Sequence, residues 1–243
     1  MQYRADFLLE GLVGVFWIAT AIVPLCVVFQ SRDNVGGWTF GEALLVMGWF
    51  TLLDGVLEGA INPSLVAVVD HIRKGTLDFV LMKPADAQFL VSTARFQPWR
   101  AIHLLAAMAL FAWGFHLLGR GPSLQAVAVA CVAMIGAVAV LYSVWILTVS
   151  AAFYVVRIDN LTILFISIFD AARWPVSVFR GPMRLVFTFV IPLAVMTTFP
   201  AQALLGTLPA STLAATLAGA LVALGLSRAV WKRSIARYTS AGG

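Results

Sequence analysis

Two carboxylates inside an apolar run are the residues of this sequence best suited to chemistry. Asp54, Glu58 and Asn62 recur at four-residue spacing, so they share one face if the run is helical. A carboxylate at the centre of a bilayer costs about 2.5–3.5 kcal/mol on insertion scales, which makes it a functional candidate. Asp54 and Glu58 could line the path of a polar or cationic substrate, or pair with a base on a second membrane subunit. Alternatively, the run ends early and Glu58 lies in the headgroup region.

A charged segment is the second candidate. Residues 70–90, DHIRKGTLDFVLMKPADAQFL, form the longest stretch of the chain that is rich in ionisable groups. Such a stretch must lie in water or against another protein. The plainer alternative is a solvated loop whose bases set the membrane orientation or contact anionic lipid.

Motifs for nucleotide binding and hydrolysis are absent from the sequence. There is no G-x-x-x-x-G-K-[ST], and not even a Gly-Lys dipeptide, so the chain has no P-loop to hold a nucleotide. H-E-x-x-H and G-x-S-x-G are also missing. His71, His103 and His116 are scattered, and we expect packing or interfacial positions for them. We therefore expect no catalytic residue, metal or cofactor on this chain, and any ATP hydrolysis must occur on another protein.

The composition places these candidates in a membrane. Of 243 residues, 61% are hydrophobic and 11% are charged, and the mean hydropathy is +0.95. Apolar runs of about 20 residues recur, which is typical of a polytopic helical membrane protein. The 16 Lys and Arg residues exceed the 11 Asp and Glu residues. In a membrane protein, excess base belongs to cytoplasmic loops, so we do not expect nucleic-acid binding.

The apolar runs predict an all-α protein with a single domain over residues 1–243. Six membrane spans are expected, at residues 8–30, 40–61, 101–118, 124–156, 158–174 and 210–230. The second span is expected to end at the break signal Asn62-Pro63. Four prolines interrupt residues 170–206, and we expect residues 182–206 to re-enter the membrane without crossing it. The alternative takes residues 185–199 as the fifth crossing.

The bases predict the orientation of these spans. With both termini and residues 70–90 in the cytoplasm, 11 Lys and Arg residues lie inside and 5 lie outside. The five outside bases are Arg32, Arg120, Arg173, Arg180 and Arg184. This asymmetry follows the positive-inside rule.

The charged segment and the proline-rich region together resemble the type-2 ABC exporter permeases. In residues 70–90, an acidic and basic cluster leads into Gly-Thr-Leu-Asp, an apolar run and a proline. Residues 173–206, RWPVSVFRGPMRLVFTFVIPLAVMTTFPAQALLG, are similar to the stretch that follows the fifth span in that family. The resemblance covers nearly the whole chain and is nearest to small bacterial permeases. The basic Arg180 and Arg184 in an outer loop depart from the pattern.

The resemblance implies a membrane subunit driven by other proteins. It implies a bacterial inner-membrane location and two cytoplasmic ATPase subunits, which hold ATP and Mg. It also implies a second permease, expected to be a different chain, although a homodimer is possible. A coupling helix over residues 70–82 would seat in the ATPase. The expected charged contacts are Asp70, Arg73, Lys74 and Asp78, and the expected apolar anchor is Leu77, Val80 and Leu81.

Two other functions remain open from the residues alone. One is a transporter or channel driven by an ion gradient, in which Asp54 and Glu58 form the ion site. The other is a membrane assembly or signalling subunit that transports nothing.

Overall fold

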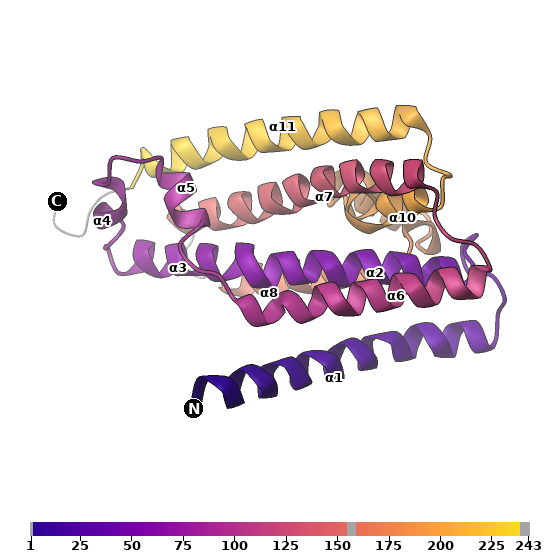
Figure 1. Cartoon of the computed structure of the whole chain (residues 1–243). Coiled ribbons are helices and arrows are strands. Elements are labelled where there is room, and N and C mark those ends of the chain that lie inside the picture. The colour runs from indigo at the N-terminus through magenta and orange to yellow at the C-terminus, as the bar shows by residue number, and fades with distance from the viewer. Residues whose placement is uncertain (1, 155–158, 239–243) are drawn as a thin grey trace.

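The apolar runs form long helices that lie side by side, as Figure 1 shows for the computed structural model. The structure describes the backbone of residues 2–154 and 159–238, and the side chains of residues 13–14, 16–17, 19–154 and 163–238. Within these ranges it contains no β-strand, only one bridge between Val35 and Trp38. The long helices are α1 (Gln2–Gln30), α2 (Phe40–Val56), α6 (Ile102–Leu118), α7 (Leu124–Ser150) and α11 (Ala210–Ile235).

Shorter helices connect the long ones. They are α3 (Asn62–Arg73), α4 (Asp78–Leu81), α5 (Ala87–Ser92), α8 (Asp159–Phe169), α9 (Pro182–Leu185) and α10 (Phe199–Leu204). The 3₁₀ turns are η2 (Pro98–Ala101), η3 (Ala151–Phe153), η4 (Asp170–Arg173) and η5 (Val176–Val178). The π-helical turns are η1 (Leu57–Ile61), η6 (Val186–Val190) and η7 (Ala194–Thr198).

The prediction of an all-α membrane protein is confirmed. Among the described residues, four helical stretches are long and apolar enough to cross a membrane: Phe40–Arg73, Pro98–Leu118, Leu124–Phe153 and Ala210–Ile235. These match the predicted second, third, fourth and sixth spans. α8 and η4 cover most of the predicted fifth span. Val156, Arg157 and Ile158, at the expected junction of the fourth and fifth spans, lie outside the described residues.

The second span does not break at Asn62-Pro63, contrary to the prediction. It continues to Arg73 as one helical stretch of 34 residues. The π-helical turn η1, just before Asn62, lets the helix accommodate Pro63 without ending. Pro63 has no backbone N–H to donate to the Gly59 carbonyl. That carbonyl instead accepts a hydrogen bond from the backbone N–H of Gln97 at 2.8 Å. The sequence signal was real, but a neighbouring segment satisfies the group that the proline leaves unpaired.

Glycines on α2 and α6 let the two helices pack closely. A Cβ at Gly55 would lie 2.6 Å from Cβ of His103, and one at Gly48 would lie 2.5 Å from the ring of Phe111. A Cβ at Gly114 would lie 2.8 Å from the backbone oxygen of Gly41. Hydrogen in place of a side chain at these positions brings the two backbones together. Gly41, Gly48 and Gly55 recur every seven residues, so one face of α2 meets α6 along its length.

The proline-rich region packs against the end of the bundle that is remote from α4 and α5 (Figure 1). Trp38, in the loop before α2, donates from Nε1 to Ser177 Oγ at 3.0 Å. Beyond Ser177, the helical pair Pro182–Val190 and Ala194–Leu204 is bent by 70°. Pro192, at the bend, lines an apolar groove with Val144 and Leu147 of α7. The returning arm packs Ala201 against Ala130, nearer the start of α7, so the chain enters the bundle and returns to the same end.

Substitution of Gly114 should test the close packing of α2 and α6. We expect Gly114→Ala to lower the stability of the protein, by about 1–3 kcal/mol, because the added methyl group meets backbone that cannot move aside. Gly219→Ala on α11 is the matched control, since a Cβ there meets no atom within 4 Å. Thermal unfolding in detergent measures both. Equal midpoints for the two variants would contradict the close contact.

Candidate functional site

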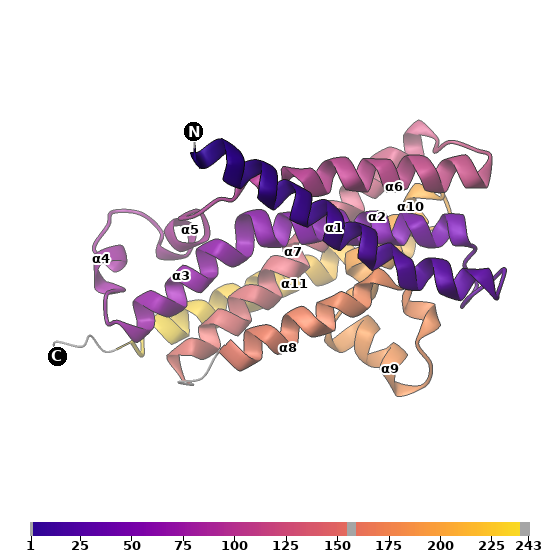
Figure 2. The same ribbon diagram turned by 90° about the horizontal axis from the view of Figure 1, so that it is seen from below.

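A cavity of about 870 Å³ lies among α1, α2, the start of α6 and η4. Figure 2 shows α1 lying across α2 at this level. The polar lining of the cavity includes both predicted carboxylates, Asp54 and Glu58, together with Arg100, His103 and Arg173. Its apolar lining includes Trp17, Phe50 and Trp99. The structure therefore brings the two acids together with bases of the same chain and with aromatic side chains.

Asp54 pairs with a histidine that the sequence did not single out. His103 is 4% exposed, and its Nε2 lies 3.2 Å from Oδ2 of Asp54. Its Nδ1 lies 3.1 Å from the carbonyl oxygen of Arg100. The imidazole is thus held between the carboxylate of Asp54 and the backbone of Arg100. The contact between Gly55 and Cβ of His103 places the histidine here, and the seven-residue glycine repeat is the sequence signal that could have found it.

Glu58 is held on two sides. The amide of Asn62 donates to Glu58 Oε1 at 3.1 Å, which bears out the shared helical face. Trp145 of α7 donates in turn to Asn62 Oδ1 at 3.4 Å. Arg100 lies 3.8 Å from Glu58 Oε2, beyond hydrogen-bond distance. The contact between Glu58 Oε2 and Arg100 is therefore a loose ion pair and not a hydrogen bond.

The third acid–base pair comes from η4. Arg173 donates to Asp170 Oδ1 at 2.6 Å, and its guanidinium lies 5.0 Å from the centre of the Phe50 ring. Phe50 is ten residues into α2, so Arg173 lies within the bundle. The predicted orientation groups Arg173 with the outer-loop bases, and its side of the membrane stays a prediction; the structure shows that Asp170 and the face of Phe50 hold its guanidinium.

Several polar atoms beside this cavity have no partner among the described residues. They are Nε1 of Trp99 and the Nε atoms of Arg100 and Arg173, all buried. Unpartnered buried donors are rare in folded proteins, and they mark places where water or a ligand completes the hydrogen bonding.

Residues 70–82 of the charged segment fold in two helical pieces, not as the one helix expected there. α3 ends at Arg73, the chain turns at Gly75 with φ of 64°, and α4 begins at Asp78. Glycine suits this left-handed conformation because it lacks a Cβ. The turn is closed by a 2.8 Å hydrogen bond between His71 Nδ1 and Thr76 Oγ1.

The turn also determines which side chains of the segment are exposed. Leu77 is 0% exposed and belongs to the core of the bundle, and Val80 and Leu81 pack against that core. The three residues expected as an outward-facing anchor thus stabilise this chain itself. The exposed large apolar side chains of the segment are instead Phe79, Met82 and Phe89, at 66%, 72% and 64%. Asp70, Arg73 and Lys74 are exposed and Asp78 is half-buried.

A polar network attaches α5 to two long helices. Arg228 of α11 donates to both carboxylate oxygens of Asp86, at 2.9 Å for Oδ1, and to Gln88 Oε1 at 2.8 Å. Gln88 donates to the hydroxyl of Tyr142 on α7 at 3.0 Å, and Ser92 Oγ lies 2.7 Å from the same hydroxyl. Asp86 also caps α5 by accepting from the backbone N–H of Phe89. We refer to Asp86, Gln88, Ser92, Tyr142 and Arg228 as the α5 latch.

Comparison with known proteins identifies a family. A family model described as ABC-2 family transporter protein matches residues 15–242. No curated protein and no solved structure gives a significant match.

The α5 latch should persist at mildly acidic pH. Hydrogen bonds from Arg228 and from the backbone N–H of Phe89 lower the pKa of Asp86. A carboxyl whose pKa is lower in the folded state contributes stability above its unfolded pKa, and loses it only as the pH falls through the lowered value. Between pH 7 and pH 5, we therefore expect unchanged amide-exchange protection of α5 after correction for intrinsic rates.

Asp86→Asn should reduce that protection at both pH values, since it removes the charge that Arg228 binds. Asp70→Asn is the control, because Asp70 lies outside the latch. Loss of protection in the unaltered protein between pH 7 and pH 5 would contradict the assignment.

Proposed function

The chain belongs to the ABC-2 transporter family, and from that premise we propose that it is the non-catalytic permease subunit of an ABC exporter. Separate cytoplasmic ATPases drive it, and a second permease completes the substrate path. The family match over residues 15–242 carries this proposal. The lack of any P-loop in the sequence agrees with ATP hydrolysis on partner chains.

The proposed topology has six crossings, with both termini on the cytoplasmic side of a bacterial inner membrane. α1 starts and α11 ends at the end of the bundle that carries α4 and α5 (Figure 1). α1 has 29 residues, enough for a span. The path of the bent pair after Pro182 supports a re-entrant region over residues 182–206.

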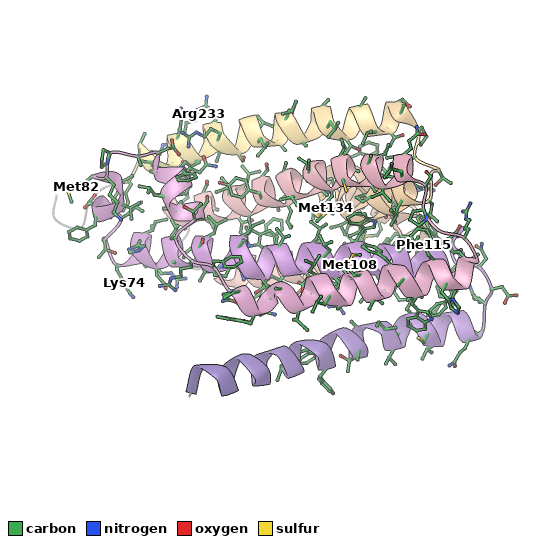
Figure 3. The ribbon with its side chains drawn as sticks, in the orientation of Figure 1. Lys74, Met82, Met108, Phe115, Met134 and Arg233 are labelled. Carbon is green, nitrogen blue, oxygen red and sulfur yellow. The ribbon has the colours of Figure 1, made fainter. Side chains whose placement is uncertain are left out.

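The proposed ATPase contact is the exposed surface of the charged segment. Lys74, Met82 and Arg233 lie at the same end of the bundle (Figure 3), where Phe79 and Lys83 are also exposed. An exposed phenyl ring and thioether ringed by bases suit an interface with an apolar centre and a charged rim. Phe79 and Met82 replace Leu77 as the proposed apolar anchor, while Asp70, Arg73, Lys74 and Asp78 remain proposed charged contacts.

The α5 latch offers a route from this surface to the spans. A displaced α5 pulls on α7 through Tyr142 and on α11 through Arg228, since each is hydrogen-bonded to α5. α2, η1 and α3 form one continuous helical stretch, which carries Asp54 on α2 and Glu58 on η1. We propose that ATPase closure moves both routes together and so changes the cavity, where Asp54 and Glu58 contact the substrate.

Co-purification tests the ATPase contact. Phe79→Asp with Met82→Asp should remove a Walker-motif ATPase that co-purifies with the unaltered chain after gentle extraction, because carboxylates replace the apolar anchor. Leu124→Asp is the control, since Leu124 is also an exposed apolar residue, at 87%, and begins α7 at the opposite end of the bundle (Figure 1). Mass spectrometry identifies the partners, including any second permease. Retention of the ATPase by the double variant would contradict this contact.

Tyr142→Phe tests the route through the latch. It removes the hydroxyl that bonds Gln88 and Ser92 and keeps the ring, so folding should change by only about 1 kcal/mol. In the co-purified complex we expect ATP hydrolysis to continue while substrate-dependent stimulation falls several-fold. Tyr154→Phe is the matched control, because Tyr154 bonds none of these residues. Stimulation equal to that of the unaltered complex would contradict transmission through α5.

A further inference from the structure

We propose that the cavity between α1, α2 and α6 binds an organic cation with an apolar body. The proposal rests on the function proposed above and names the substrate class for that site. A volume of about 870 Å³ lies in the range of cavities that enclose drug-sized molecules.

Carboxylates outnumber guanidinium groups in the lining of the cavity. The carboxylates are Asp54, Glu58 and Asp170, and the guanidinium groups are Arg100 and Arg173. The side chains of Asp54 and Glu58 are 30% and 23% exposed, and those of Arg100 and Arg173 are 32% and 35% exposed. Arg173 is bound to Asp170, which leaves Arg100 to face two carboxylates, Asp54 on α2 and Glu58 on η1.

Arg100 is the base that a ligand can replace. Its 3.8 Å separation from Glu58 is too long for a hydrogen bond, and its Nε has no partner among the described residues. A ligand cation that enters between Asp54 and Glu58 gains both carboxylates and displaces only this loose contact. In the low dielectric of a membrane-level cavity, that exchange favours a cation over a neutral ligand of the same shape.

Aromatic side chains supply the rest of the recognition. Trp17 of α1 and Trp99 of η2 line the cavity together with the carboxylates. Indole faces attract cations through their quadrupole and also provide apolar contact. A ligand with a charged group and an apolar body can therefore contact both the carboxylates and the indole rings of the lining.

The test uses two probes of one shape and opposite charge, tetraphenylphosphonium and tetraphenylborate. The chain is reconstituted in nanodiscs of zwitterionic lipid, and binding is measured above that of empty nanodiscs. We expect saturable binding of the cation and none of the anion. Asp54→Asn with Glu58→Gln should weaken cation binding at least tenfold. Glu42→Gln is the matched control, because Glu42 caps the far end of α2 and glutamine can keep that cap.

Arg100→Gln should change cation binding in the opposite direction. Removal of the competing base should tighten cation binding several-fold, which a variant that had merely misfolded would not do. Equal binding of the two probes, unchanged binding by the double variant, or weaker binding by Arg100→Gln would overturn the inference. Co-purification of the ATPase with the unaltered chain separates the two proposals. If the ATPase co-purifies and the unaltered chain does not bind the cation, only the substrate class fails; if the unaltered chain binds the cation and no ATPase is found, the permease proposal fails.

Discussion

The closeness of α2 and α6 is the constraint on which the site depends. Three glycines on one face of α2 and Gly114 on α6 allow backbone to approach backbone. That approach brings His103 to Asp54 and Arg100 toward Glu58. A carboxylate within the membrane is stable only with a partner or with water. The glycines therefore allow the two acids to reach the partners that stabilise their charge within the membrane.

The class of fold followed from the sequence because apolar runs of membrane length have few other outcomes. The runs at residues 101–118 and 210–230 are helices close to their expected bounds. Ends of helices were harder to predict, since they depend on contacts between distant segments. Pro63 lies inside a helix because Gln97, more than thirty residues away, bonds the carbonyl that the proline leaves free. No local signal contains that information.

Only the residues of the candidate site that lie on one helix could be predicted from the sequence. Asp54, Glu58 and Asn62 were recognised from their spacing, because one helix fixes their relation. Their partners His103 and Arg100 lie on α6 and η2, and only the packing of the bundle brings them near. The same reason explains the error at Leu77. Spacing places Leu77 on an apolar face with Val80 and Leu81, but it cannot say whether that face covers the bundle or a partner protein.

The π-helical turn at Leu57–Ile61 determines how the side chains in the two halves of the second span are rotated about the helix axis relative to one another. One residue of an α-helix corresponds to about 100° of rotation, and a π turn acts as one inserted residue. The side chains after this turn are therefore rotated relative to those before it. Asp54 faces the cavity, and Ser64 faces the backbone of Arg95, to which its hydroxyl is bonded at 2.7 and 2.9 Å. The two halves of this helix thus contact different parts of the protein. Side chains of the first half line the polar cavity. Side chains of the half near the charged segment contact the loop that leads into α6.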